Sequence, residues 1–268
     1  MLTLNSVGMV FARGTPDENT ALKNINLTVH TGDFITVIGS NGAGKSTLYN
    51  VIAGTFVPTS GSITLCLDGK NERVITHDKE YTRARYIGRI FQNPLLGTAG
   101  KMSLEDNMMI CLRKGYKGLK ISLNAKMREY FKSRLRELGM GLENRLNDNV
   151  EQFSGGQRQA LTLLMAVMSE PALLLLDEHT AALDPANAEL VMELTRKFAQ
   201  TYKLTVMMIT HNMHHALSFG SRLLMMDSGN IILDVEGEEK AKLSVSDIIE
   251  RFRRIKNEDL ASDEMLLQ

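Results

Sequence analysis

Residues 39–47 read Gly-Ser-Asn-Gly-Ala-Gly-Lys-Ser-Thr, and this stretch decides the fold. It follows an apolar run at 34–38, which is typical of a buried parallel strand, and it precedes a segment at 48–53 that is typical of a helix. The stretch fulfils the pattern Gly-x-x-x-x-Gly-Lys-Ser/Thr without a mismatch. A strand, a glycine-rich loop and a helix in this order predict a phosphate-binding loop.

The residue types in this loop suit a polyphosphate and divalent-metal ligand. Glycines allow backbone N–H groups to approach phosphate oxygens, and the N-terminus of the following helix adds further donors. Lys45 is expected to neutralise the β- and γ-phosphates of ATP, and the Ser46 hydroxyl to ligate Mg²⁺. A plain turn would need neither residue, and a dinucleotide fingerprint would place a glycine where Asn41 stands. The residues expected around the phosphates are Gly39, Ser40, Asn41, Gly42, Ala43, Gly44, Lys45, Ser46 and Thr47.

Composition favours an ordinary globular α/β protein. The 268 residues carry 31 basic and 31 acidic side chains, and this balance gives no support for a nucleic-acid partner. Two cysteines do not make a disulfide framework and favour a reduced, cytoplasmic protein. The N-terminus lacks a signal-peptide pattern. The most apolar region, 161–176, is interrupted at 169–171, so no transmembrane segment is expected.

The remaining pattern predicts two additions to a parallel core sheet. Residues 1–11 are interpreted as an edge strand of an antiparallel sheet, together with a strand at 22–29. A further strand is expected at 62–67. A helical segment is expected to be inserted at about 95–165, within a domain that spans 1–235. The charged extension, 236–268, is expected to be partly helical. Nine Lys or Arg between Arg113 and Arg136 are interpreted as a solvated helix face, with a patch for acidic lipid headgroups as the alternative.

Several polar residues stand at the ends of predicted strands and helices. Ser154 and Gln157 have the spacing of a capping box, and the two glycines between them indicate a bare helix N-terminus that a phosphate can approach. Asp177 and Glu178 end a four-leucine strand, at the edge of the sheet where ligands bind, and are interpreted as a Mg²⁺ ligand and a water-polarising base. The other candidates are the helix N-cap Asp184, the strand-end residues Gln92 and His211, and Phe11, for which adenine stacking and a core position are equally favoured.

In this order the segments resemble the ATPase subunits of ABC transporters. The similarity covers about residues 2–235 and includes a Walker A loop at 39–47, a Q-loop at Gln92, a signature at 153–157, a Walker B strand at 173–178 and a switch histidine at His211. The resemblance implies a P-loop NTPase core with a RecA-like parallel sheet, an antiparallel β subdomain and an inserted α-helical subdomain. Two residues depart from the family pattern: Phe153 replaces leucine, and His179 replaces proline.

The resemblance also implies a dimeric mechanism. Ser154, Gly155 and Gly156 are expected to contact the γ-phosphate of ATP bound to a partner chain, and Gln157 belongs to the same nucleotide-binding segment. Asp184 matches the D-loop aspartate of the family and is also expected to be a nucleotide-binding residue. Asp177, Ser46 and Gln92 are the expected Mg²⁺ ligands, and Glu178, His211 and Gln92 the catalytic residues. ATP binding would then drive a head-to-tail homodimer, or a pair with a similar subunit, and hydrolysis would release it.

The function expected from this resemblance is energy coupling for a bacterial importer, possibly of amino acids. It implies separate permease subunits, a solute-binding protein, and a peripheral location at the cytoplasmic face of the membrane. The alternative is a soluble ABC ATPase without a permease, for example in iron–sulfur cluster assembly; a non-catalytic module is disfavoured because Glu178 and His211 are both present. The residues considered for the permease groove, with a core position as the equal alternative, are Met102, Leu104, Met108, Met109 and Ile110.

Overall fold

The computed structural model describes residues 1–67, 72–112 and 123–254 of the chain. The strands are β1 (Leu2–Phe11), β2 (Asn19–Val29), β3 (Phe34–Gly39), β4 (Ser60–Cys66), β5 (Glu72–Val74), β6 (Ile87–Ile90), β7 (Leu173–Asp177), β8 (Val206–Ile209), β9 (Arg222–Asp227) and β10 (Asn230–Glu236). The α-helices are α1 (Lys45–Ala53), α2 (Glu80–Arg83), α3 (Leu104–Leu112), α4 (Ala125–Arg136), α5 (Gly155–Met168), α6 (Pro185–Thr201), α7 (Met213–Ser218) and α8 (Gly237–Lys242). Short 3-10 turns are η1 (Pro94–Gly97), η2 (Leu142–Asn144) and η3 (Val150–Gln152).

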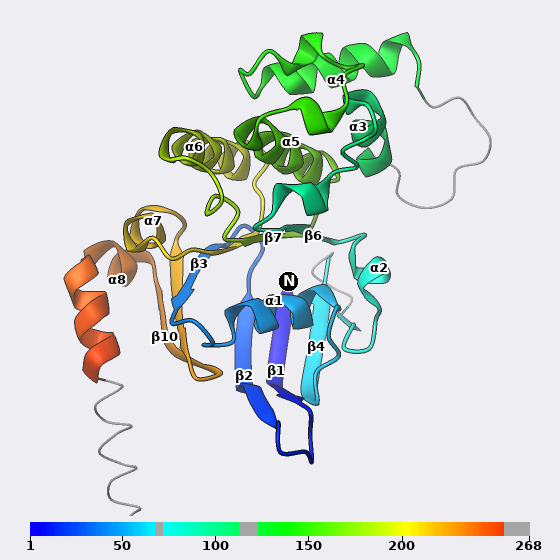
Figure 1. Ribbon diagram of the computed structural model, residues 1–268. Helices are drawn as coiled ribbons and strands as arrows, with labels where there is room; N and C mark the ends of the chain where they lie inside the picture. The colour runs from blue at the N-terminus through cyan, green and yellow to red at the C-terminus, as the bar shows by residue number, and fades with distance from the viewer. Residues whose placement is uncertain (68–71, 113–122, 255–268) are drawn as a thin grey trace, which may run out of the picture.

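A six-stranded sheet forms the centre of the described molecule. Its strand order is β10-β9-β3-β8-β7-β6, and all neighbours are parallel except the β9–β10 hairpin. The sheet is covered on both faces, which explains why strands such as β7 are continuous leucine runs rather than alternating patterns. α1 and the antiparallel sheet cover one face, and α5 and α6 cover the other (Figure 1). The expected α/β class with a parallel core is confirmed.

The second sheet is antiparallel, with the order β2-β1-β4-β5. The prediction that residues 1–11 form an edge strand is wrong, because β1 pairs with β2 on one side and with β4 on the other. Loose alternation at Leu2, Leu4 and Val7 did reveal the buried face, since all three are in the core. It could not reveal how many neighbours the strand has, because backbone pairing leaves no mark on the side-chain pattern.

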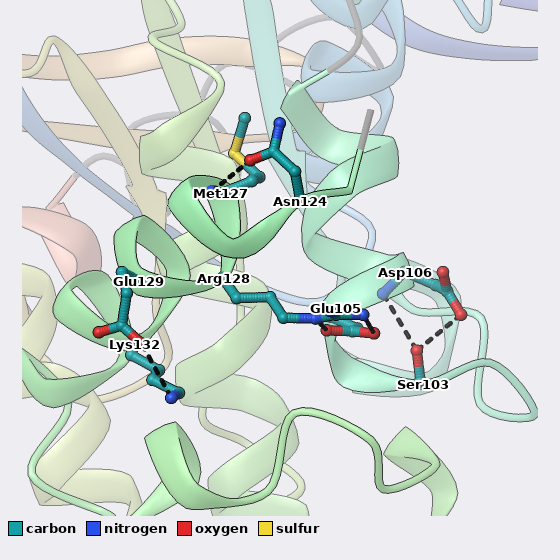
Figure 2. Close-up of polar contacts among 8 residues, drawn as sticks. All are labelled: Ser103, Glu105, Asp106, Asn124, Met127, Arg128, Glu129 and Lys132. Atoms are coloured by element: carbon teal, nitrogen blue, oxygen red, sulfur yellow. Dashed lines mark hydrogen bonds and ion pairs between the residues drawn. The ribbon is translucent and has the colours of Figure 1, made fainter. Parts of the chain in front are cut away.

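Between β6 and β7, the helices α3 and α4 pack against α5 and are joined to each other by polar contacts. Figure 2 shows the main one: the Arg128 guanidinium on α4 donates from Nε and Nη2 to the Glu105 carboxylate on α3, at 2.7 and 3.1 Å. Ser103 and Asn124 cap the two helices at their N-termini. Residues 113–122 of the basic run lie outside the described residues. On α4, Arg128, Lys132 and Arg134 pair with acidic side chains of this chain. Arg128 and Lys132 are 47% and 37% exposed, as expected of a solvated helix face, whereas Arg134 is largely buried.

The five apolar residues at 102–110 do not share one environment. Leu104 and Met108 are fully buried and belong to the core that joins the insert to α5, so the groove hypothesis is wrong for these two. Their helical spacing could not show this, because an inward stripe and a docking stripe have the same period. Met109 is partly buried against the same core, while Met102 and Ile110 are 39% and 54% exposed.

The described part of the C-terminal extension is helical, at α8 and again at 245–254, as expected. It is fastened to the core by two buried side chains. Ile248 joins a small apolar cluster with β9 and α7. The Lys240 ammonium donates to the carbonyls of Phe219 and Gly220, at the end of α7, and burial lowers its pKa to about 8.

Candidate nucleotide-binding site

The loop between β3 and α1 can be built only with glycine at two positions. Gly39 has φ 150°, and a Cβ there would lie 2.2 Å from the Met226 carbonyl oxygen. Gly44 has φ 98°, and a Cβ there would lie 2.5 Å from the Ala21 carbonyl oxygen. Gly42 has φ 80° but open space around it. The first and last glycines of the motif are therefore required by close packing inside the chain, while the middle one leaves room for a ligand.

Lys45 lies at the centre of this loop. Its side chain is buried, and Nζ donates to the carbonyl oxygens of Gly39 (2.8 Å) and Ser40 (2.9 Å). Burial lowers the pKa of the ammonium, while the carboxylates of Glu178 and Asp177 act to raise it. The ammonium is thus held where phosphate oxygens would complete its coordination, with two acidic side chains in its field.

The loop is braced by the β9–β10 turn, which the sequence did not single out. Ser40 Oγ donates to Asp227 Oδ1 at 2.8 Å, and Ser228 Oγ donates to Asp227 Oδ2 at 2.9 Å. The Gly229 N–H donates to the Ala43 carbonyl at 3.1 Å. The only sequence signal was the Asp-Ser-Gly turn, which reads as an ordinary hairpin.

The structure brings Glu178 and His211 together at the carboxyl edge of the sheet. β7 and β8 are parallel neighbours, so the residues that follow them emerge side by side. His211 Nε2 lies 2.5 Å from Glu178 Oε1, with the carboxylate side chain 16% exposed and the imidazole 50% exposed. Glu178 has φ 47°, a left-handed conformation that is strained for a non-glycine residue. Such strain is common where a side chain must be aimed at a reacting group.

Asp177 is the inner carboxylate of this pair. Burial raises its pKa, and the guanidinium of Arg89 acts against that rise. The guanidinium lies 3.3 Å away on β6, the next strand of the sheet. The Asp177 carboxylate also acts to raise the pKa of the Lys45 ammonium.

The two remaining candidates, Gln92 and Phe11, lie in different settings. Gln92 is exposed and follows β6, the strand that pairs in parallel with β7. Phe11 is half-buried, and its ring meets Phe56 edge-to-face, with centroids 5.3 Å apart and an interplanar angle of 81°. One part of the Phe11 ring thus packs on the core. The contact is compatible with a core position and also with adenine stacking on the rest of the ring.

The segment 154–157 forms the expected capping box at the start of α5. Gln157 N–H donates to Ser154 Oγ, and the Ser154 N–H donates to Gln157 Oε1. Gly156 is buried against α6: a Cβ there would lie 2.2 Å from Asn187 Oδ1. At Gly155 a Cβ would have an ordinary contact of 3.5 Å with Leu183. The lack of a side chain at Gly156 is therefore required by packing against Asn187. Gly155 has no such requirement within the chain, and its position leaves space for a ligand.

Asn187 belongs to the cap of α6. The Asp184 carboxylate accepts from the Asn187 N–H at 3.1 Å and from its side-chain amide at 2.6 Å, which confirms the predicted N-cap.

We expect Gly156→Ala to displace Asn187 and to lower the free energy of unfolding by about 1–3 kcal/mol, since overpacking forces side chains off their rotamers. Urea unfolding measures this change. Stability equal to the wild type would mean that Asn187 moves away without cost.

His179 is buried beneath the edge of the sheet that carries Glu178 and His211. Its Nε2 lies 3.1 Å from Thr195 Oγ1, and Thr195 itself donates to the Val191 carbonyl, so the imidazole is the donor in this contact. Burial, aided by the neighbouring His215, lowers the pKa of His179 to about 4. The residue that departs from the family pattern is thus a neutral core group rather than an exposed one.

The resemblance predicts that His179→Pro keeps ATPase activity, and the structure adds an expected cost of about 1 kcal/mol for the lost hydrogen bond at pH 7. As the pH falls from about 6.5 towards 4, unfolded wild type binds a proton at His179 that the native state excludes. The free energy of unfolding of the wild type therefore falls by up to about 3 kcal/mol over this pH range, and that of the variant does not fall for this reason. Urea unfolding should show the wild type more stable than the variant at pH 7, and this difference in the free energy of unfolding should vanish or reverse at pH 5, because the wild type loses about 2 kcal/mol over that range. Thr195→Val is the control, because it keeps the acid-side loss; a constant gap for His179→Pro would contradict the expectation.

A family model described as "ABC transporter" matches residues 22–181, more than half of the chain. The chain belongs to the ABC transporter family of ATP-binding domains. A tyrosine transport ATP-binding protein of Clostridioides difficile is 40% identical over 253 residues, which span 94% of this chain and 98% of that protein. The methionine import ATP-binding protein MetN 2 of Enterococcus faecalis is 33% identical, over 95% of this chain and 72% of that protein.

Solved structures agree with this ABC ATPase assignment. A dimeric ATP-binding cassette in a post-hydrolysis state with ADP and Pi has a TM-score of 0.69 and 27% identity, over 88% of this chain and 98% of that one. A nucleotide-free ABC transporter cassette has a TM-score of 0.74 and 25% identity, over 94% and 98%. The chain is therefore an ATP-hydrolysing cassette and an ATP-binding subunit of an ABC transporter. Through residues 1–67, 72–112 and 123–254, we find no helix with the length and apolar character to span a bilayer.

The donor set of this ABC ATPase fits magnesium held jointly with ATP. Asp177, Ser46 and Gln92 offer only hard oxygen donors for a metal, as Mg²⁺ prefers. Across the described ranges, no group of three His, Cys, Asp or Glu could hold an ion by itself. A site that needs substrate phosphates to complete its coordination has this composition.

Proposed function

We propose that this ABC ATPase is the energy-coupling subunit of an importer for a small solute such as an amino acid. It works at the cytoplasmic face of the cell membrane, with separate permease subunits and a solute-binding protein. The main support for ATP hydrolysis is the contact of His211 with Glu178. Glu178 and its neighbour Asp177 also interact with the Lys45 ammonium. The near full-length similarity to a tyrosine transport ATP-binding protein supports the choice of solute class.

Each polar residue of the edge has a chemical role in this proposal. The loop amides and Lys45 bind the β- and γ-phosphates, and the free face of Phe11 stacks on adenine. Ser46, Asp177 and Gln92 would hold Mg²⁺, which neutralises charge on the phosphate oxygens when bound. Glu178 accepts a proton from the attacking water, and His211 orients that carboxylate and reaches towards the γ-phosphate.

The signature segment acts on a second copy of the chain. Ser154 and Gly155 lie at the N-terminus of α5, where backbone N–H groups favour an anion, and the free space at Gly155 suits a partner's γ-phosphate. A dimer formed in this way assembles when ATP binds and separates after hydrolysis.

Gly155→Ala tests this assignment. The added methyl meets only Leu183 at an ordinary distance, so the variant should fold with an unchanged melting temperature. We expect it to lose ATP-dependent dimerisation, because the methyl occupies the space assigned to the phosphate. Size-exclusion chromatography with ATP, in a hydrolysis-deficient background, measures the dimer. A normal dimer with normal stability would contradict the proposed role.

The permease contact is assigned to the exposed turn after Gln92. Leu95 and Leu96, in η1, are 50% and 67% exposed, and this turn packs on α5, the helix that carries the signature. An exposed leucine pair beside a nucleotide-sensing glutamine suits an apolar partner. Leu96→Asp should abolish permease association in a pull-down and keep basal ATPase activity. Val74→Asp, at an equally exposed site on β5, is the control that should bind normally.

Transport itself is tested in proteoliposomes that hold the chain together with the permease that co-purifies with it. ATP-dependent uptake of labelled tyrosine, methionine and a branched-chain amino acid is measured against a panel of sugars and metal ions. Uptake of an amino acid that stops in Glu178→Gln supports the proposal. ATPase activity without any permease association, and without a membrane-bound fraction in cells, would favour the soluble alternative.

A further inference from the structure

Arg89 joins the two nucleotide-binding motifs of the chain, although neither motif contains it. It lies on β6, where it pairs in register with Leu175 of β7. Its Nη1 donates to Asn50 Oδ1 at 2.7 Å, and its Nη2 donates to Asp177 Oδ2 at 3.3 Å. Asn50 is on α1, the helix that begins with Lys45. One guanidinium thus ties the Walker A helix to the Walker B carboxylate.

The surroundings hold this guanidinium in place. The side chains of Arg89 and Asp177 are only 12% and 15% exposed. The Arg89 guanidinium carbon lies 4.6 Å from the centroid of the Phe91 ring, a cation–π contact with the residue just before Gln92. Its Nε and the hydroxyl of Tyr49 are both buried without a hydrogen-bond partner among the described residues. Burial of an unpaired N–H costs free energy, and the two hydrogen bonds that the guanidinium makes to Asn50 and Asp177 offset that cost.

We propose that Arg89 is a positioning residue for Mg²⁺: its fork holds the Asp177 carboxylate at a set distance from α1, so that Asp177 and Ser46 are aligned for the ion before ATP arrives. This rests on the proposed function, which assigns the metal to those two residues. Carboxylates that bind metals commonly depend on such an outer hydrogen-bond partner, and its loss costs about 10–100-fold in metal affinity. The role is distinct from catalysis, because Arg89 reaches Asp177 and not the reacting phosphate.

The chemistry requires arginine at this position. The planar guanidinium presents two nitrogens in fixed directions, one towards Asn50 and one towards Asp177. A lysine would bring the same charge on a single flexible point and could not hold both partners. Arg89→Lys therefore separates the charge from the fork, and Arg89→Met removes both while keeping a long apolar side chain.

The test measures ATP affinity, with and without Mg²⁺, by displacement of a fluorescent nucleotide from the full-length chain. Arg89→Met and Arg89→Lys should each need about tenfold more Mg²⁺ for half-maximal binding, and their Mg²⁺-free affinity should stay within about twofold of the wild type. Asn50→Ala should show a smaller shift in the same direction, and the double variant should add nothing to Arg89→Met. Melting temperatures confirm folding, and Asn50→Ala carries the test if the arginine variants do not fold.

Four outcomes separate the possibilities. Unchanged Mg²⁺ dependence in folded Arg89→Met, or additive effects of Asn50→Ala and Arg89→Met, would overturn the proposal. Wild-type behaviour of Arg89→Lys would also overturn it, because charge alone would then suffice. If wild type itself gains no affinity from Mg²⁺, the metal assignment of the proposed function fails, and the inference about Arg89 fails with it.

Discussion

Glu178→Gln should bind ATP normally and lose turnover by about 10²–10⁴-fold, the range expected for loss of a general base. Glutamine has nearly the same shape as glutamate, and it can still accept a hydrogen bond from His211, so the local structure should survive. It cannot take a proton from water at neutral pH. Since hydrolysis ends the ATP-bound state, the variant should accumulate as an ATP-bound dimer. Phosphate release measures turnover, and size-exclusion chromatography with ATP measures the dimer.

A second variant tests the contact seen in the structure. His211→Ala removes the partner that lies 2.5 Å from the Glu178 carboxylate. It should reduce turnover strongly and leave the melting temperature nearly unchanged, because the imidazole is half exposed. If Glu178→Gln keeps turnover within about tenfold of the wild type, another group activates the water and the assignment of the base is wrong. A dimer that fails to form while ATP is bound would contradict the proposed switch.

Lys45→Ala should weaken ATP binding by about 10–100-fold, which corresponds to the loss of one or two charge-assisted hydrogen bonds to phosphate. The ammonium is buried between the loop carbonyls of Gly39 and Ser40. Removing it takes away the only loop cation and two internal hydrogen bonds together. Equilibrium binding of a fluorescent ATP analogue measures the affinity.

Ser40→Ala separates these two effects. It breaks the hydrogen bond to Asp227 that braces the loop, and it keeps the ammonium. We expect only a few-fold loss of affinity in Ser40→Ala, and a melting temperature close to that of Lys45→Ala. Equal losses in the two variants would show that loop shape, rather than charge, controls binding. Wild-type affinity in Lys45→Ala would refute the assignment of the phosphate-binding loop.

Much of the site could be predicted because its parts are local. A phosphate-binding loop needs its glycines, lysine and hydroxyl within nine consecutive residues, so the sequence at 39–47 carries the whole pattern. The caps at Ser154 and Asp184 are equally local, and both were confirmed as hydrogen-bonded caps. The parallel core could be predicted for a similar reason, because strands buried on both faces are continuous apolar runs.

Other features depended on residues far apart in the chain. Gly156 is bare because of Asn187, which follows 31 residues later and meets it only when α5 packs against α6. Leu104 and Met108 proved to be core because α3 turns that face towards α5, a choice that helical spacing leaves open.

The sequence by itself determined the phosphate-binding loop, the capped helices and the αβ class, because each follows from chemistry within about one turn or strand. Only the tertiary structure decided that β1 lies inside its sheet, that Asp227 braces the loop, and that Arg89 joins Asn50 to Asp177. These features arise where strands distant in sequence become neighbours. Pairing of that kind is set by the packing of the whole sheet, which no single stretch of the chain contains.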